Sequence, residues 1–174
     1  MNQNNIYSTQ FKVPCLGKPE FLSPLTRWEE QFIDETHRVL YSADLSSVMD
    51  SLKNSDTLLS FEKAGAREKL YFNPKDINCG IVTCGGLCPG INDVIRAIVY
   101  ESYERYEVRR VYGFKFGYKG MIKENGVAPL LLDTAMVNDI HHQGGTVLGS
   151  SRGPQDTSKI VDYLQELEIS ILFT

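Results

Sequence analysis

The feature that most constrains this chain is a short apolar run that leads into a glycine-rich turn and then into a segment with helical periodicity. Residues 77–83 (INCGIVT) are typical of a buried strand in a parallel sheet. The turn that follows contains Gly85, Gly86 and Gly90. After it, apolar residues recur at the spacing of one helical face, at Ile91, Val94, Ile95, Ile98 and Val99. The pattern predicts a helix from Ile91 to about Arg105, and therefore one strand–turn–helix unit of an α/β domain.

The rest of the chain repeats this alternation. Further strands are expected at 108–113, 128–132, 146–148 and 169–174. One helix is expected from Thr134, with Asp133 as its cap, to the Gly144-Gly145 pair, and another after Asp156 or Thr157. The alternation predicts an α/β fold with a doubly wound, mostly parallel, Rossmann-like sheet. Because the last strand has neither loop nor helix after it, we expect the sheet to be incomplete within this chain.

The first part of the chain lacks the strand–helix alternation. We expect residues 1–75 to form an irregular N-terminal extension that packs on the core, and residues 76–174 to form the α/β domain, truncated at its C-terminal end. Within the extension, residues 26–40 predict one helical face, marked by Trp28, Phe32 and Val39, and a polar stretch follows at 42–56.

Charge and composition exclude several partners. The net charge of −4 is spread along 174 residues without a basic run, so nucleic acid is not an expected partner. No segment approaches the roughly 18 apolar residues of a membrane helix, and residues 1–5 do not resemble a signal peptide. We therefore expect a cytoplasmic protein with no membrane contact. Three cysteines, Cys79, Cys84 and Cys88, lack the paired C-x2-C spacing of zinc sites, which favours packed thiols over a metal centre.

The glycine turn has the character of an anion-binding site. Glycines allow positive φ and a close approach of the backbone to a ligand, and the N-terminus of the following helix offers free N–H groups. Three glycines and a proline within six residues favour a phosphate site over a simple tight turn. A Walker A loop is disfavoured, because Ile91-Asn92 stands where Lys-Ser/Thr is required. A dinucleotide site is disfavoured because Lys115, rather than an acidic residue, lies near the end of the second strand.

Arg152 is the second candidate for phosphate chemistry. It stands among Gly149, Ser150, Ser151 and Gly153, after a predicted strand whose carboxyl end faces the ligand edge of the sheet. A planar guanidinium bridges two phosphate oxygens, and its charge stabilises a transferring phosphoryl group. His141 and His142 are expected to be solvated residues late in a helix rather than catalytic groups.

Three motifs together resemble one known family. Residues 80–96 (GIVTCGGLCPGINDVIR) closely resemble the first strand–helix unit of the 6-phosphofructokinases. The resemblance continues through 117–120 (GYKG) and 144–153 (GGTVLGSSRG), in that family's order and spacing, and covers about residues 61–174. The turn sequence is similar to the plant, protist and spirochaete branch. Residues 76–174 would then be the first part of a nucleotide-binding phosphofructokinase domain.

The resemblance implies transfer of the γ-phosphate of ATP to the 1-hydroxyl of fructose 6-phosphate in glycolysis, with Mg²⁺ as cofactor and pyrophosphate as the alternative donor. By position in the motifs, the backbone N–H of Gly86 would meet donor phosphates, Tyr118 and Gly153 would lie beside the nucleotide, and Arg152 would contact the transferring phosphate. Arg96 matches an effector-binding position of bacterial relatives. The family also implies a homo-oligomer, a dimer or a tetramer.

The family's catalytic aspartates do not occur in these 174 residues. Neither the Gly-Gly-Asp-Gly turn that binds Mg²⁺ nor the Thr-Ile-Asp-Asn-Asp segment that holds the base is present, so both would lie beyond Thr174. We therefore expect no metal ligand in this chain, and no turnover from it alone. The alternative to an N-terminal part of a kinase is a non-catalytic phosphate-binding module.

Overall fold

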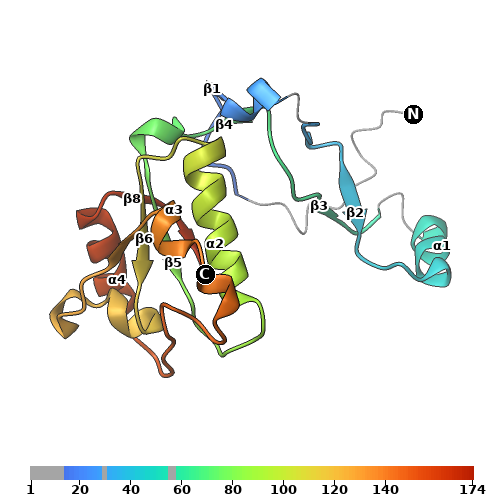
Figure 1. Ribbon diagram of the computed structural model, residues 1–174. Helices are drawn as coiled ribbons and strands as arrows, with labels where there is room; N and C mark the ends of the chain where they lie inside the picture. Colours follow the sequence, from blue (N-terminus) through green and yellow to red (C-terminus); the bar gives the residue numbers. More distant parts are fainter. Residues whose placement is uncertain (1–13, 29–30, 55–57) are drawn as a thin grey trace. The chain divides into compact units, whose positions relative to one another are not determined.

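The computed structural model describes residues 14–28, 31–54 and 58–174 (Figure 1). The polar residues 1–5, which do not resemble a signal peptide, lie outside this part of the chain. The chain divides into two units, Met1–Tyr71 and Phe72–Thr174. Within the described residues, no helix combines the length and the apolar character needed to cross a membrane.

The second unit, which is described without gaps, is built on a four-stranded sheet with the order β7-β6-β5-β8. Its strands are β5 (Asn78–Val82), β6 (Arg110–Phe114), β7 (Leu130–Leu132) and β8 (Ile169–Phe173). Strand β5 lies at the centre and is parallel to both β6 and β8, whereas β7 is antiparallel to β6. All five residues of β5 are buried, as its apolar sequence predicts. The predicted mostly parallel α/β sheet is confirmed.

Helices cover both faces of this sheet (Figure 1). One apolar cluster joins Cys79 and Ile81 of β5 to Ile95 and Val99 of α2 (Ile91–Tyr100). On the other face, Val82 and Phe114 pack with the apolar side of α4 (Thr157–Glu166): Ile160, Tyr163 and Leu164. Because successive residues of a strand point to opposite faces, the strand sequences supply both clusters at once. The doubly wound arrangement is therefore confirmed.

The predicted helix boundaries are mostly right. Helix α2 begins at Ile91 and continues from Glu101 as a π-helical turn, η5 (Glu101–Arg105). Asp156 caps α4, since its carboxylate accepts hydrogen bonds from the backbone N–H groups of Ser158 and Lys159. One detail of the α2 face was wrong: Val94 is 58% exposed.

The helix predicted from Thr134 to the Gly144-Gly145 pair is shorter than expected. Asp133 caps it, and its carboxylate accepts from the N–H of Met136. However, α3 ends at Val137 (Thr134–Val137), and a separate 3-10 turn, η8 (Ile140–His142), follows. Asp139, with φ −111° and ψ 5°, has left the helical region between the two pieces. The remaining short helices of this unit are η4 (Pro74–Asp76), η6 (Gly117–Met121) and η7 (Lys123–Asn125).

The described part of the first unit contains two small antiparallel sheets. One pairs β1 (Phe21–Leu22) with β4 (Lys69–Leu70), and the other pairs β2 (Arg38–Leu40) with β3 (Ser60–Glu62). The helix predicted over 26–40 is wrong, because a 3-10 turn, η3 (Pro24–Trp28), and then β2 occupy the described part of this segment.

Local and distant hydrogen bonds explain that error. The Asp34 carboxylate accepts from the N–H and the hydroxyl of Thr36, which forms a tight turn where the helix was expected. The Arg38 guanidinium donates to the hydroxyl and the carbonyl of Ser60, which fixes β2 on β3. The polar stretch at 42–56 contains helix α1 (Leu45–Asn54), capped by Asp44, which its composition did not predict.

Candidate active site

The glycine turn connects β5 to α2 at the carboxyl end of the central strand. Gly90 is the N-cap of α2, with φ 87°, and no side chain caps the helix there. The first intrahelical bond runs from the N–H of Val94 to the Gly90 carbonyl, so the earlier N–H groups of the turn have no intrahelical acceptor. A Cβ at Gly85 or Gly86 would meet nothing within 4 Å. The turn therefore presents open backbone at the positive end of a ten-residue helix.

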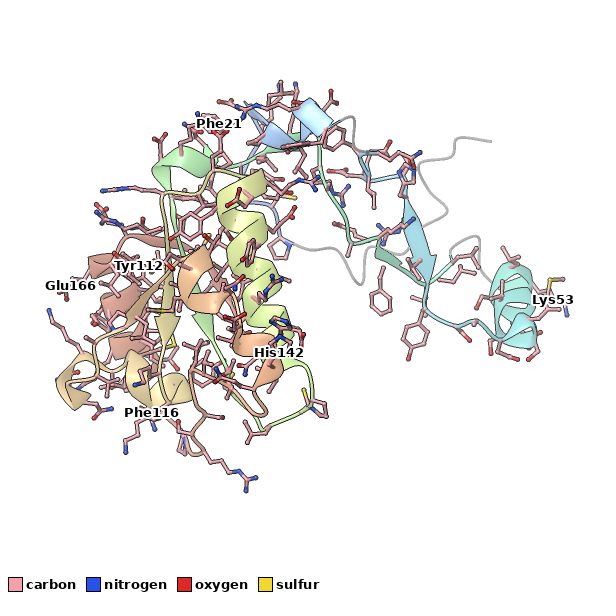
Figure 2. All side chains as sticks on the ribbon, viewed as in Figure 1. Phe21, Lys53, Tyr112, Phe116, His142 and Glu166 are labelled. Atoms are coloured by element: carbon pink, nitrogen blue, oxygen red, sulfur yellow. The ribbon has the colours of Figure 1, made fainter. Side chains whose placement is uncertain are left out.

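The loop after β6 lies beside this turn. Phe116 and Gly117 both adopt positive φ, at 61° and 58°. A Cβ on Gly117 would lie 3.3 Å from the Thr83 carbonyl and 3.1 Å from the Ser151 nitrogen, so the loop is closely packed against both neighbouring segments. In Figure 2, Phe116 lies at the lower edge of the sheet, where the β6 arrow ends.

Tyr118 is 37% exposed on the same loop. The pKa of its phenol is raised above the ordinary value, first because its hydroxyl shares a hydrogen bond with the side chain of Cys84. That contact joins the loop after β6 to the first residues of the glycine turn. The fold thus brings Tyr118 close to the glycine turn, and the motifs predict that both contact the same ligand.

The segment 143–151 completes this edge, but not as a strand. The strand predicted at 146–148 is wrong, because these residues form a turn. Their backbone groups bond to other partners: the N–H of Val147 donates to Asn92 Oδ1 at 2.9 Å, and the Leu148 carbonyl accepts from the N–H of Phe116 at 2.7 Å. A sheet ladder would need the same groups. Leu148 is still fully buried, which accounts for the apolar pattern that suggested a strand.

Arg152 and Gly153 follow directly and are exposed. Arg152 makes no hydrogen bond or ion pair with the described residues, so its guanidinium is available to a ligand. Gly153, at φ 99°, keeps an open backbone with nothing within 4 Å of a Cβ. The four residues predicted for donor binding, Gly86, Tyr118, Arg152 and Gly153, are all solvent-exposed. Their roles stay predictions.

Two polar residues, the buried Asn92 and the half-buried Thr83, were not identified from the sequence. Asn92 is 2% exposed, and its amide bonds to both Val147 and Gln143. Thr83 bonds through its hydroxyl to Thr146 and to the Gly149 carbonyl. One signal was available for Asn92: it lies three residues before Ile95 and seven before Val99, on the face of α2 that is buried. A polar residue on such a face needs a partner.

The other residues considered in the sequence analysis are Arg96, His141 and His142, and none of them makes a hydrogen bond or ion pair with the glycine turn or Arg152 in the described residues. The Arg96 guanidinium donates to the Asn138 carbonyl at 3.1 Å and lies 4.4 Å from the centre of the Tyr100 ring. His141 and His142 are exposed, with ring centres 3.8 Å apart, as expected for solvated residues; Figure 2 shows His142 near the lower end of α2.

The cysteines do not form a metal centre in the described residues, where no group of three or more His, Cys, Asp or Glu is arranged to hold an ion. Cys15, Cys79, Cys84 and Cys88, all among the described residues, form no disulfide. Burial raises the pKa of the Cys79 thiol to about 11, which keeps it neutral and packed in the core.

The glycine turn, the N-terminus of α2 and the exposed Arg152 lie at one edge of a doubly wound sheet, an arrangement typical of α/β proteins that bind phosphate groups. A family model described as phosphofructokinase matches residues 78–174. The chain belongs to the phosphofructokinase family, which confirms the resemblance of its motifs.

Several named proteins are similar to this chain. The ATP-dependent 6-phosphofructokinase of Trypanosoma brucei brucei is 41% identical over 98% of the chain, and that of Borreliella burgdorferi is 40% identical over 94%. The chain spans 36% and 37% of the length of these curated relatives. A crystal structure of Pichia pastoris phosphofructokinase in the T-state has a TM-score of 0.50 at 23% identity; the match covers 67% of this chain and 13% of that one, and supports the fold.

Proposed function

We propose that this chain is the N-terminal, donor-binding part of a 6-phosphofructokinase that transfers the γ-phosphate of ATP to the 1-hydroxyl of fructose 6-phosphate in glycolysis. Membership of the phosphofructokinase family supports the reaction class. The relatives named above, which are called ATP-dependent, support ATP rather than pyrophosphate as the donor. The observation that carries the proposal is the convergence of the glycine turn, the loop of Tyr118 and the segment before Arg152 at one edge of the sheet.

The chain's own residues have distinct parts in this proposal. The backbone N–H of Gly86 and the first turn of α2 bind the donor phosphates, which the helix dipole favours at that end. Tyr118 and Gly153 line the nucleotide. Arg152 faces the transferring phosphoryl group, where its charge offsets the negative charge that develops on the equatorial oxygens. Because these groups act through their positions and charges and form no covalent bond with the substrate, the rate depends on the distances at which they are held.

The magnesium ion implied by the family resemblance has no matching aspartate among the residues described here, because the Gly-Gly-Asp-Gly turn does not occur in the sequence. No group of three or more metal-binding side chains is present among them, so we assign no step of the reaction to a metal held by this part of the chain. The segment that holds the base in the family resemblance, Thr-Ile-Asp-Asn-Asp, does not occur in the sequence, and we assign proton removal from the sugar hydroxyl to no residue of the chain.

The compartment and the assembly belong to the same proposal. Four cysteines without a disulfide among the described residues suit a reducing compartment such as the cytoplasm. Formation of a homodimer or homotetramer, and the packing of residues 1–75 on the core, stay predictions from the family resemblance.

A donor-selection assay tests the proposal. The protein expressed from its full reading frame is supplied with fructose 6-phosphate and either ATP or pyrophosphate, and fructose 1,6-bisphosphate is measured. We expect turnover with ATP. Turnover with pyrophosphate alone would overturn the donor assignment. Binding of ATP without turnover would replace the kinase by a phosphate-binding module.

A further inference from the structure

We propose that Asn92 and Thr83 are positioning residues that hold the segment leading to Arg152 against the donor-phosphate turn. The inference rests on the proposed function, because it concerns the placement of the arginine relative to the bound donor. Both residues act through their side chains on backbone groups that are 51 to 66 positions away in the sequence. Neither is predicted to touch the transferring phosphate through its side chain.

Asn92 connects the helix that meets the donor with the segment that leads to the arginine. It is the second residue of α2, where the backbone N–H has no intrahelical acceptor and faces the proposed phosphates. Its side chain is buried and uses both ends of the amide: Nδ2 donates to the Gln143 carbonyl at 3.0 Å, and Oδ1 accepts from the N–H of Val147 at 2.9 Å. One residue therefore links the anion site to the start of the 143–151 segment.

Thr83 holds the other end of that segment through a chain of hydrogen bonds. Its Oγ1 donates to the Gly149 carbonyl at 2.7 Å, which uses its one proton, so at the 3.0 Å contact Thr146 Oγ1 is the donor to Thr83. Thr146 Oγ1 in turn accepts from the N–H of Leu148 at 3.2 Å. Every hydroxyl in this chain thus donates once and accepts once. The arrangement fixes the backbone three residues before Arg152.

These bonds replace the sheet ladder that a strand at 146–148 would have had. Without a ladder, the position of the segment depends on side chains and on the Phe116 N–H. The Arg152 side chain makes no hydrogen bond or ion pair with the described residues. The position of its guanidinium therefore depends on the position of the backbone at residue 152. A displacement of about 1 Å at a group that stabilises a transition state lowers the rate by as much as a hundredfold. Loss of either side chain should therefore act on the chemical step.

A matched pair of variants isolates the Thr83 hydroxyl. Thr83→Val keeps the shape and removes the hydroxyl, whereas Thr83→Ser keeps the hydroxyl. In the protein expressed from its full reading frame, we expect Thr83→Val to lower kcat about tenfold with a change in KM for ATP of less than about threefold, and Thr83→Ser to restore most of the rate. A Thr83→Val enzyme with unchanged kcat would overturn the inference.

A double-mutant cycle separates positioning from general destabilisation. If Thr83 acts through Arg152, Thr83→Val should lower kcat by less than about twofold when Arg152→Ala is already present. An equal loss in both backgrounds would contradict the proposal, because the two residues would then act independently. Asn92→Ala should show the same dependence on Arg152, and serves as the second variant if Thr83→Val does not fold.

Amide hydrogen exchange gives a readout that does not need activity. In Asn92→Ala, exchange of the Val147 amide should accelerate at least about tenfold, while the amides of β5 remain protected. Unchanged exchange at Val147 would overturn the positioning role even if catalysis were impaired. Conversely, an enzyme without turnover but with faster exchange in the variant would refute the proposed function and leave the positioning contacts intact.

Discussion

A Cβ atom on Gly120 would lie 1.7 Å from the carbonyl oxygen of Lys115. The two residues close the loop between β6 and η7, in which Tyr118 is exposed. No side chain fits at that separation, and the atom in the way belongs to the backbone. Gly120 is thus required by the close approach of two chain segments in the loop that carries a predicted donor contact.

Gly120→Ala should destabilise the protein by about 2–4 kcal/mol, because the loop backbone must move to admit the methyl group. Gly144→Ala is the matched control: Gly144 is exposed, and its Cβ would meet nothing within 4 Å. The control should change the free energy of unfolding by less than about 0.5 kcal/mol. Urea denaturation measures both variants, and similar stabilities for the two would contradict the close contact.

Arg152→Ala should reduce kcat in the protein from the full reading frame about a hundredfold, equivalent to about 3 kcal/mol of transition-state stabilisation. KM for ATP should change much less, because the charge acts mainly on the transferring group. Arg109→Ala is the control, since Arg109 is an exposed arginine just before the start of β6 that pairs with Glu168 at 3.4 Å. Equal kinetics in the two variants would contradict this role and show that Arg152 is an ordinary surface arginine.

The 174-residue chain alone should not convert fructose 6-phosphate, because neither the Gly-Gly-Asp-Gly turn nor the Thr-Ile-Asp-Asn-Asp segment occurs in it, and its described residues hold no group of three or more metal-binding side chains. A coupled assay for fructose 1,6-bisphosphate, compared with a blank lacking protein, measures this. Turnover that disappears in Arg152→Ala would show that the catalytic groups are within the chain after all.

Stability should fall at alkaline pH through Cys79. Burial raises the pKa of its thiol from the ordinary 9.0 to about 11, so the neutral thiol is favoured in the folded state. This contribution is complete below pH 9 and is lost as the pH rises through 11. The two-unit difference corresponds to about 2–3 kcal/mol.

Cys79→Ala should remove that part of the pH dependence, as measured by urea denaturation between pH 8 and about 10.5. Val111→Ala provides the comparison: Val111 pairs with Cys79 on the neighbouring strand and is fully buried, but it has no titrating group. Its destabilisation should be the same at both ends of the range. If the curves of Cys79→Ala and wild type stay parallel, the buried thiol is not the cause.

Much of the fold follows from local patterns in the sequence. The apolar run at 77–83 and the helical period after Gly90 predict β5, α2 and the glycine turn between them, because burial on one or both faces selects residues at the period of each element. Asp133 and Asp156 were recognised as caps because a cap acts on the next two or three residues. The candidate site residues Gly86 and Arg152 come from the same local patterns together with the family motifs; the structure shows that both are exposed, and their roles stay predictions.

The tertiary structure decided those features that depend on hydrogen bonds between residues far apart in the sequence. The segment 146–148 has the composition of a strand, but its backbone groups have other partners: the Val147 N–H donates to Asn92, and the Leu148 carbonyl accepts from Phe116. The carbonyl of the next residue, Gly149, accepts from Thr83. Arg38 likewise lies in a strand because its guanidinium donates a hydrogen bond to Ser60, which is 22 residues away in the sequence. A periodic pattern records whether a side chain is buried, but not which group its backbone will bond. That choice is made only when the loops of the folded sheet meet, because buried donors and acceptors must be paired by whatever lies nearest.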